Sequence, residues 1–410
     1  MRAVIIGGGA AGLFAAGWLT RGGVDTTIIE HSGELGKKIL VTGKGRCNVT
    51  NDCDETEFMK NVRTNPKFMY SSIYSFSPGK TMEFFEGLGV PLKTERGRRV
   101  FPVSDRADDI RQALIRWAED ARVIYDDVTG IDTENGKVTG VRCASGKTVK
   151  ADRVLLATGG LSYRNTGSTG DGYRFASRLG HTIVTPTASL VPLVENGTKG
   201  RRMMGLSLRN VNLTVTDGKK KVFSEQGEML FTHFGISGPL VLSASSHLKG
   251  EDLSRYKAVI DLKPALNEEQ LDRRVQRDFE KFHLKQAANS LDLLLPTKMR
   301  EVVLEDWGID PGKPVNQITR EERMKLVHLL KNFTLSLQSR YKIDVAVITS
   351  GGVAVKEIDP STLSSKLVDG LYFAGEVIDV DAYTGGYNLQ IAFSTAYSAA
   401  RAMIERSHSK

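Results

Sequence analysis

Short apolar runs separated by glycine turns and helix signals organise the first 190 residues. The runs predict strands at residues 2–6, 26–30, 122–125 and 154–157. A further pair of alternating runs within residues 136–149 flanks the turn Ala144-Ser145-Gly146 and predicts a β-meander beside the main sheet. The alternation of strand and helix signals is typical of an α/β fold.

The pattern changes near Pro186 and Pro192. Residues 206–262 carry short alternating runs, which favour an antiparallel sheet or small barrel, and Asp217-Gly218-Lys219 is typical of a hairpin turn. Helix signals follow. The segments 267–270 (NEEQ) and 319–322 (TREE) have the form of capping boxes, and the apolar positions after the second one extend to Phe333.

The last 65 residues again show a strand, a glycine turn and a helix. This tail is too short to bury a core by itself, so we expect it to return to the first domain. The predicted architecture is a Rossmann-like domain of residues 1–190 and 345–410, split by an insertion. The insertion contains a β-barrel-like part of residues 191–265 and 336–344, and a helical subdomain of residues 266–335.

The apolar stretch of residues 3–19 superficially resembles a signal peptide or membrane anchor. Five glycines interrupt it, and no other segment approaches the roughly 18 uninterrupted apolar residues that a spanning helix requires. The chain has only three cysteines, which suits a reducing compartment better than a disulfide framework. We therefore expect a cytoplasmic protein with no membrane segment.

The chain carries a formal net charge of +8, which leaves room for a polyanionic partner. Its densest basic clusters are residues 199–202 and 219–221, and the second coincides with the predicted hairpin turn. Acidic residues are interspersed and no aromatic residues alternate with the lysines. A solvated turn explains the cluster more simply than a nucleic-acid surface, so we expect a small-molecule substrate instead.

The first strand runs directly into residues 7–12 (GGGAAG), which have the GxGxxG pattern of a dinucleotide-binding turn. Gly7 and Gly9 permit a sharp turn and a close approach to a pyrophosphate, and Gly12 permits the next helix to pack on its strand. Free amides at the helix end favour an anion. Glu30 ends the second strand eighteen residues past Gly12 and is suited to a ribose 2′-hydroxyl, which favours an unphosphorylated ribose.

A second glycine-rich loop, residues 36–51 (GKKILVTGKGRCNVTN), follows Glu30. Arg46 there can offer charge-assisted hydrogen bonds to phosphate, and Asn48 has both a donor and an acceptor for a heteroaromatic ring edge. The alternative is an ordinary glycine-rich turn.

This loop resembles the signature of the YhiN/BaiN-type family of FAD-dependent oxidoreductases, within the glutathione-reductase-like flavoprotein superfamily. Residues 157–160 (ATGG), 227–239, 371–376 and 383–390 (YTGGYNLQ) also resemble blocks of that family, so the resemblance spans nearly the whole chain. It implies a non-covalently bound FAD and oxidoreductase activity. It further implies that the helix beginning near Leu389 points its amides at the flavin ring, where they stabilise the anionic reduced form.

The fingerprint and the resemblance together predict a set of cofactor-binding residues. Relatives carry aspartate in place of Glu376, so a backbone contact from that turn is an alternative to a carboxylate contact. The predicted set is Gly7, Gly9, Ala10, Ala11, Gly12, Glu30, Lys38, Gly43, Arg46, Cys47, Asn48, Val128, Ala157, Thr158, Gly159, Gly375, Glu376, Gly386, Asn388 and Leu389.

The preferred hypothesis is that FAD takes hydride from NAD(P)H and passes it to a small organic acceptor; the resemblance alone suggests an enone C=C bond. The chain has one complete fingerprint, so the nicotinamide would dock transiently at the flavin. The alternatives are an FAD-containing RNA-modifying or RNA-binding protein and a non-catalytic flavin sensor. The acceptor, the choice between NADH and NADPH, and the oligomeric state stay open.

The positions of the cysteines and histidines bear on three kinds of chemistry: a catalytic disulfide, a metal site and proton donation. Cys47 and Cys53 have five residues between them, whereas disulfide reductases of this superfamily have four, so we do not expect a catalytic disulfide. The seven histidines lack metal-binding spacing, so no metal site is expected. His233, between a hydrophobic strand and a glycine turn, is the candidate proton donor, with a structural histidine as the alternative.

Overall fold

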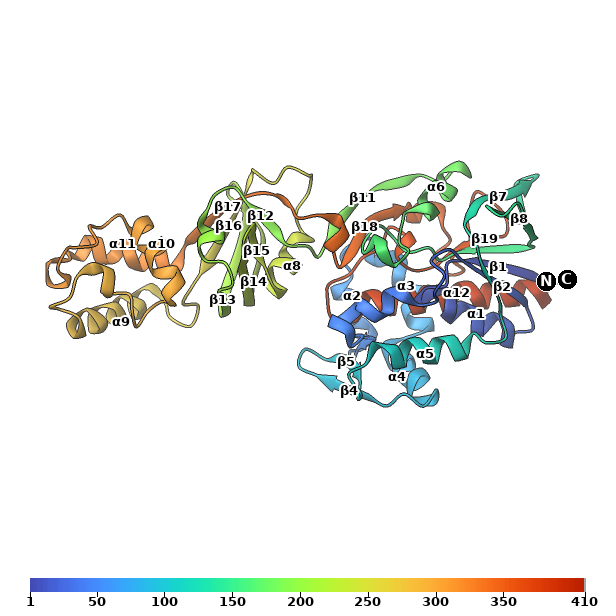
Figure 1. Cartoon of the computed structure of the whole chain (residues 1–410), viewed down its shortest axis with the longest axis horizontal. Helices are drawn as coiled ribbons and strands as arrows, with labels where there is room; N and C mark the ends of the chain where they lie inside the picture. Colours follow the sequence, from blue (N-terminus) through green and yellow to red (C-terminus); the bar gives the residue numbers. More distant parts are fainter. Residues whose placement is uncertain (409–410) are drawn as a thin grey trace. The chain divides into compact units, whose positions relative to one another are not determined.

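The computed structural model describes residues 1–408, which form two compact units. One unit combines Met1–Ser189 with the segment that begins at Ile343, and the other spans Leu190–Lys342. In Figure 1 the first unit is blue to green and red, and the second runs from light green to orange. The chain thus leaves the first unit after residue 189 and returns to it at residue 343.

A five-stranded parallel sheet forms the centre of the first unit. Its order is β19-β10-β1-β2-β6, and every neighbouring pair is parallel. The strands are β1 (Arg2–Ile6), β2 (Asp25–Glu30), β6 (Arg122–Tyr125), β10 (Arg153–Leu156) and β19 (Leu371–Phe373). The four strands predicted in the first 190 residues are confirmed to within one residue, and the C-terminal segment supplies the fifth.

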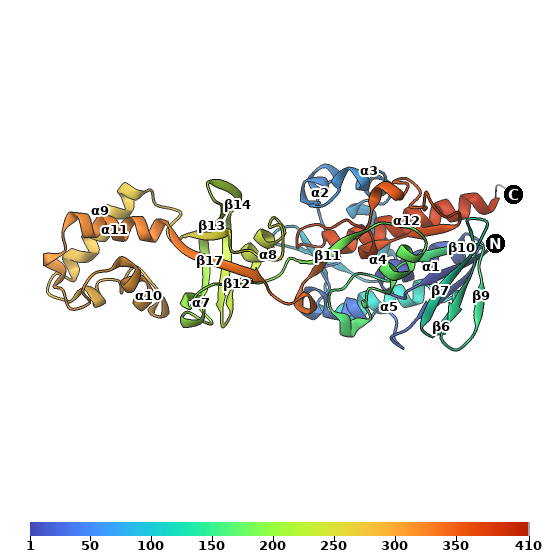
Figure 2. The ribbon, with the colours of Figure 1, turned by 90° about the horizontal axis from the view of Figure 1, so that it is seen from above.

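Two helices that are far apart in sequence pack together in this unit. They are α1 (Ala10–Arg21) and α12 (Tyr387–His408), and Figures 1 and 2 show both beside the strands of the sheet. Phe14 of α1 contacts Phe393 of α12, with ring centroids 5.1 Å apart. Because both faces of the sheet are covered, β1 and β10 read as nearly unbroken apolar runs.

Smaller elements complete the first unit. Its other helices are α2 (Glu55–Asn61), α3 (Pro66–Ser75), α4 (Pro78–Gly87), α5 (Ala107–Trp117) and α6 (Asp171–Arg178). Its smaller sheets contain β3 (Thr50–Asn51) with β5 (Arg99–Pro102) and β4 (Leu92–Glu95); β7 (Val128–Glu134) with β8 (Lys137–Cys143) and β9 (Thr148–Lys150); and β11 (Ile183–Ser189) with β18 (Ile348–Val353). The β8–β9 pair confirms the predicted meander.

Six antiparallel strands close into a barrel in the second unit. They are β12 (Leu193–Glu195), β13 (Ser207–Asp217), β14 (Lys220–Thr232), β15 (Gly235–Ser237), β16 (Tyr256–Asp261) and β17 (Phe333–Arg340), accompanied by α7 (Lys199–Arg202) and α8 (Pro239–Ser245). Asp217 pairs with Lys220, which confirms the hairpin turn. The fold is therefore α/β, with a parallel Rossmann-like sheet and a barrel inserted into its sequence.

Three longer helices interrupt the barrel between β16 and β17. They are α9 (Glu268–Lys281), α10 (Thr297–Trp307) and α11 (Arg320–Lys331), and both predicted capping boxes are present, on α9 and α11. The assignment of residues 333–335 to the helical part is wrong. Phe333 and Leu335 begin β17 and point into the barrel core, since the apolar spacing before Phe333 fits a helix but the residues after it alternate.

Candidate functional site

The turn between β1 and α1 is shaped by glycines that no other residue can replace. Gly7 has φ +104°, a conformation that L side chains rarely adopt, and a Cβ on Gly7 would lie 2.6 Å from the backbone oxygen of Ala157. A Cβ on Gly12 would lie 1.9 Å from the Gly7 oxygen. Helix α1 therefore begins in direct contact with its strand, next to the end of β10.

The N-terminus of α1 has no cap of its own. Gly9 precedes the helix without a side-chain hydrogen bond, and no heavy atom lies within 4 Å of the position that its Cβ would take. The first amides of a helix have no partner inside it, and the helix dipole adds partial positive charge there. The amides of Ala10 and Ala11 thus lie at a suitable place for an anion.

Glu30 ends β2 and is held in place beside this turn. Its Oε2 accepts a hydrogen bond from the Gly8 amide and its Oε1 accepts one from the Ser32 amide, each at 2.7 Å. A carboxylate has about four lone-pair directions, so both oxygens can still accept bonds from ribose hydroxyls. The side chain is buried and fixed before any ligand arrives.

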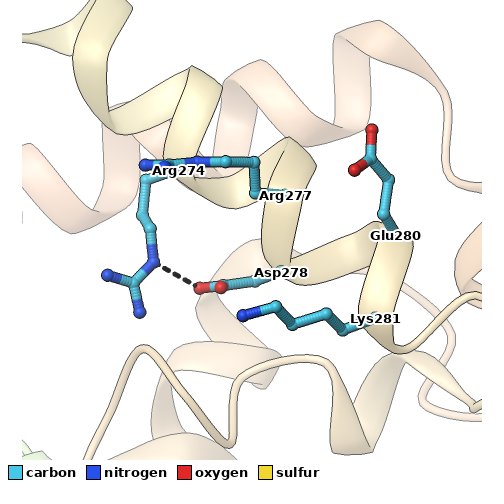
Figure 3. A pocket seen from close by; sticks show the side chains of 5 residues that line it. All are labelled: Arg274, Arg277, Asp278, Glu280 and Lys281. Atoms are coloured by element: carbon cyan, nitrogen blue, oxygen red, sulfur yellow. Dashed lines mark hydrogen bonds and ion pairs between the residues drawn. The ribbon is translucent and has the colours of Figure 1, made fainter.

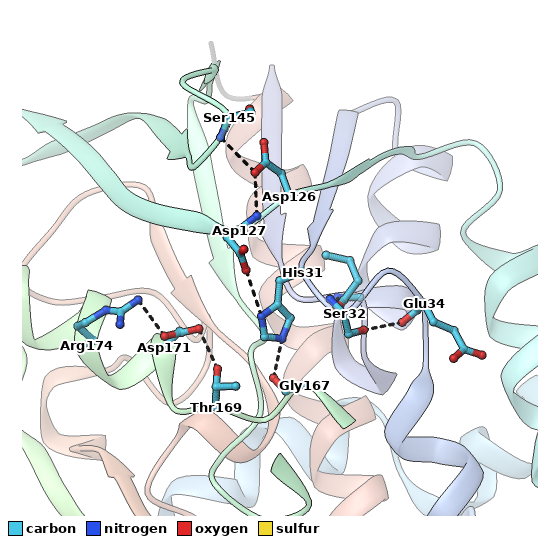
Figure 4. Close-up of polar contacts among 12 residues, drawn as sticks. His31, Ser32, Glu34, Asp126, Asp127, Ser145, Gly167, Thr169, Asp171 and Arg174 are labelled. Atoms are coloured by element: carbon cyan, nitrogen blue, oxygen red, sulfur yellow. Dashed lines mark hydrogen bonds and ion pairs between the residues drawn. The ribbon is translucent and has the colours of Figure 1, made fainter. Parts of the chain in front are cut away.

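His31, the residue after Glu30, contacts two other loops (Figure 4). Its Nε2 lies 2.8 Å from the Gly167 oxygen, and its Nδ1 lies 3.6 Å from an Asp127 carboxylate oxygen. Asp127 immediately precedes Val128, the predicted cofactor-binding residue that begins β7. The loop containing Val128 is thereby linked to the end of β2.

The loop of residues 36–51 folds tightly, and its Arg46 side chain already has partners within the protein. Gly43 has φ +56°, and a Cβ there would lie 2.8 Å from the Asn48 amide nitrogen. Arg46 forms two hydrogen bonds with Glu95, at 3.2 and 2.7 Å, and its guanidinium lies 3.9 Å from the centre of the Phe101 ring. In this structure Arg46 is thus paired with carboxylate, and a phosphate would have to compete with Glu95.

Glu376 is the centre of a buried polar cluster that no spacing in the sequence indicated. Lys38 donates to it at 2.6 Å, Ser162 at 2.8 Å and the Thr349 amide at 2.9 Å. The Lys38 charge and these donors outweigh the effect of burial, which opposes ionisation, and lower the pKa of Glu376. Its carboxylate holds distant segments together, which leaves the backbone of the turn as the natural cofactor contact.

The C-terminal block meets the loop after Glu30 through β3. A Cβ on Gly386 would lie 2.1 Å from the Thr50 oxygen, and Thr50 Oγ1 donates to Gln390 at 2.6 Å. Asn51 donates to the Gly385 oxygen at 3.0 Å. Gln390 is fully buried and belongs to the same block, although we did not predict it as a site residue.

Asn388 lies in the first turn of α12, and its side chain bonds to the backbone of the turn that precedes the helix. Its Oδ1 accepts from the Ala382 amide and its Nδ2 donates to the Ala382 oxygen, both at 2.9 Å. Leu389, in the first turn of α12, is only partly buried. A contact from this end of α12 to a ring would therefore come from backbone amides.

Segments from the two ends of the sequence meet at the turn between β1 and α1. A Cβ on Gly375 would lie 3.2 Å from the Ala11 Cβ, so the C-terminal turn lies against the first turn of α1. Ala157 and Thr158 follow β10 at the same edge of the sheet, and Gly159 adopts φ +70°. Parallel strands bring their carboxyl ends to one edge, where ligands of such sheets bind.

Two buried atoms in these segments have no partner. They are Asn48 Oδ1 and Thr158 Oγ1, both in loops predicted to contact the cofactor. Buried polar atoms are rarely left unpaired, so each is a candidate for a bond to a ligand. Together with the space beside Gly9 and the fixed Glu30 carboxylate, these groups fit a dinucleotide such as FAD.

Two carboxylates on the segment between Gly375 and Gly385 also escaped prediction. Asp381 accepts from Ser189 and Ser350, each at 3.0 Å, and Asp379 accepts from Asn65 at 2.9 Å. Burial raises the pKa of both, and for Asp379 the nearby Asp381 adds to the effect. The sequence showed only two acids in a glycine-rich loop.

The thiols and the candidate proton donor lie in different surroundings. Cys47, Cys53 and Cys143 are free, and burial raises the pKa of Cys47 and of Cys53 to about 12. His233 is exposed in the turn between β14 and β15 of the second unit, where its ring packs edge-on against Phe234. Its role as a proton donor stays a prediction.

Residues 1–408 contain neither a metal-binding cluster nor a membrane-spanning helix. In that part of the chain, no three His, Cys, Asp or Glu residues are grouped so that they can hold a metal ion. Every helix within the same range is too short or too polar to cross a bilayer.

Comparison with known proteins identifies the family of this chain. The family model described as HI0933-like protein Rossmann domain matches residues 1–402. A 3-dehydro-bile acid delta(4,6)-reductase from Clostridium scindens is 33% identical over 410 residues, covering 98% of each chain. A ribosomal RNA dihydrouridine synthase from Haemophilus influenzae is 31% identical over 402 residues, covering 97% of each chain.

The fold also matches that of a solved structure. A 3-ketosteroid delta1-dehydrogenase from Sterolibacterium denitrificans has a TM-score of 0.51 with 12% identity, over 98% of this chain and 99% of that one, which shows a common fold. The family match covers nearly the whole chain. The protein therefore belongs to the HI0933-like Rossmann-domain family, and it is an FAD-dependent oxidoreductase of the kind that its motifs resemble.

Proposed function

We propose that this protein transfers hydride from NAD(P)H, through bound FAD, to a carbon–carbon double bond conjugated to a carbonyl group. The observation that carries the cofactor part is the meeting of the first turn of α1 with the Gly375 turn, beside an uncapped helix end. FAD supplies the hydride chemistry when bound. Side chains and backbone groups of this chain supply the other functions, which are cofactor binding and proton donation.

Each part of the site has a distinct task in this proposal. The amides of Ala10 and Ala11 would bind the pyrophosphate, and Glu30 would accept bonds from a ribose. The first amides of α12 would supply partial positive charge beside the ring and would favour negative charge there. A proton must also reach the substrate carbon next to the carbonyl, and His233 remains the proposed donor.

The relatives support an enone as the class of acceptor. A 3-dehydro steroid with a double bond at position 4 is an enone, and dihydrouridine forms when the double bond of a uracil ring, also conjugated to a carbonyl, is reduced. Both names thus describe addition of hydrogen across an activated C=C bond. We propose the same reaction class for this chain, with a free small molecule as the first candidate acceptor.

The test begins with the chromophore. The purified protein is denatured and the released compound identified, and FAD is expected. The intact protein is then mixed anaerobically with NADH or NADPH and should lose its flavin absorbance, which a small enone such as cyclohexenone should restore. Absence of bleaching with both nucleotides contradicts the hydride-donor proposal, whereas bleaching without reoxidation by any enone contradicts the acceptor class.

A uracil base in RNA is the second candidate acceptor. It is favoured by the similarity over 97% of the chain to a ribosomal RNA dihydrouridine synthase and by the net charge of +8. RNA incubated with the protein and NAD(P)H should then contain dihydrouridine, which nucleoside mass spectrometry detects. We propose the cytoplasm as the location for either acceptor, since the three cysteines are unpaired.

A further inference from the structure

A pocket in the helical part of the second unit gathers positive charge. The pocket, of about 510 Å³, is lined by five residues of α9: Arg274, Arg277, Asp278, Glu280 and Lys281. The three basic side chains recur at spacings of three and four residues, so they lie on one face of the helix and span about 10 Å along it. Figure 3 shows Arg274 turned toward Asp278, with the Glu280 carboxylate apart from both.

The acidic residues do not neutralise this face. Asp278 is almost fully buried and is occupied by Arg274, whose Nε lies 2.9 Å from Asp278 Oδ2. Within residues 1–408 the side chains of Arg277 and Lys281 have no hydrogen-bond or ion-pair partner. Residues 266–335 contain 12 Lys and Arg and 12 Asp and Glu, so this part of the chain is neutral, whereas the five residues that line the pocket carry a net charge of +1.

A partly buried lysine, Lys263, interacts electrostatically with Arg274 and Asp278 of the pocket. Lys263 follows β16, and over the described chain its ammonium group has no hydrogen-bond or ion-pair partner. Burial, and after it the charge of Arg274, lowers the pKa of Lys263, although Asp278 acts in the opposite direction. A desolvated cation beside an arginine is stabilised when an anion binds between them.

We propose that this α9 pocket binds backbone phosphates of an RNA chain. An arginine held rigidly by a buried carboxylate and two cations without partners match the needs of phosphate groups, which accept several charge-assisted bonds. Cations spread over two helical turns suit a polyanion better than a single small anion. The inference rests on RNA as the second candidate acceptor.

The test compares the wild type with two double variants of equal charge change. Arg277→Ala/Lys281→Ala removes the two cations without partners. Arg273→Ala/Lys325→Ala is the matched control, because those exposed side chains already pair with Glu269 and Glu321 on the same subdomain. Binding of a fluorescein-labelled RNA stem-loop is measured by anisotropy between roughly 50 and 200 mM salt.

The pocket variant should bind RNA about tenfold more weakly, and its salt slope should fall by about 2, roughly one for each lost phosphate contact. The control variant should behave like the wild type. Both variants should keep their FAD content and their reduction of cyclohexenone, which shows that they are folded. Equal RNA binding by the pocket variant and the control overturns the proposal.

Two further outcomes separate this inference from the proposed function. If inorganic phosphate or ATP binds the pocket but RNA does not, the pocket takes a small phosphorylated ligand and the RNA assignment is wrong. If RNA binds through the pocket but no dihydrouridine forms, the binding site stands and RNA as the acceptor fails.

Discussion

The turn between β1 and α1 and the cluster around Glu376 lie in the same unit but use their polar groups in opposite ways. At the turn, the helix end has no cap and the space beside Gly9 is open. Around Glu376, Lys38, Ser162 and Thr349 already supply the carboxylate with partners. Open donors are ready for a ligand, whereas satisfied ones hold the protein together.

A residue of a sequence motif can therefore have one of two roles: it can bind a ligand, or it can hold the fold together. Both regions carry residues predicted to bind the cofactor, yet only at the turn does a helix begin without a side-chain cap. Lys38 and Glu376 connect parts of the chain that are 338 residues apart. Such residues hold distant segments together, so their substitution should change stability first.

The largest expected effect is on this ion pair. Glu376→Gln leaves the Lys38 ammonium mostly buried without an anion, which costs about 3 kcal/mol of unfolding free energy. The folded state lowers the pKa of Glu376, so its stabilisation is present above the ordinary carboxyl pKa and is lost as the pH falls through the lowered value. The free energy of unfolding, measured with urea, should therefore decrease less in the variant than in the wild type as the pH falls.

The control for this variant is Glu269→Gln. Glu269 pairs with Arg273 at an exposed position of α9, where an ion pair contributes little. If both variants unfold at the same urea concentration as the wild type, the cluster does not hold the unit together and the comparison fails.

The next effect tests the open turn. Gly9→Ala places a Cβ where the protein has no atom within 4 Å, so the FAD-free protein should unfold at nearly the wild-type temperature. A pyrophosphate lying against the turn would meet that Cβ, and the FAD dissociation constant should rise about tenfold or more, which is about 1.4 kcal/mol. Fluorescence titration of apoprotein measures it.

Gly87→Ala is the matched control, since Gly87 also has no neighbour within 4 Å and lies at the end of α4. Unchanged FAD affinity in Gly9→Ala would place the pyrophosphate elsewhere and remove the main support for the proposed site.

A smaller effect concerns Asp379. Its raised pKa means that its contribution to stability is complete below the unfolded carboxyl pKa and is lost as the pH rises through the higher folded value. Asp379→Asn should therefore make the protein more stable at pH 7, by less than the loss in Glu376→Gln, and flatten the stability profile above pH 4. Thermal unfolding at several pH values measures this, with the exposed Asp120→Asn as a control.

The smallest effect is expected at the cysteines. Because burial raises the pKa of Cys47 and of Cys53 to about 12, both thiols are protonated at pH 8 and should react slowly with iodoacetamide in the native protein. Urea-unfolded protein should react at all three cysteines. Cys53→Ser should leave NAD(P)H oxidation unchanged, and loss of turnover in that variant would revive a catalytic disulfide.

Local patterns determined much of the fold by themselves. Four strands of the parallel sheet, the hairpin at Asp217 and both capping boxes follow from hydrophobic period and turn chemistry, which act over a few residues. The start of β17 was missed because the spacing of Leu330 and Phe333 fits a helix as well as the entry to a strand.

The sequence by itself also determined the glycine turn, since Gly7 and Gly12 are required by backbone geometry close in the chain. Only the tertiary structure decided which polar groups are free. The pairing of Arg46 with Glu95, the buried bonds of Asn388 and the cluster around Glu376 depend on which segments the fold brings together. Hydrogen bonds between distant segments leave no periodicity in a sequence, because they are set by packing and not by spacing.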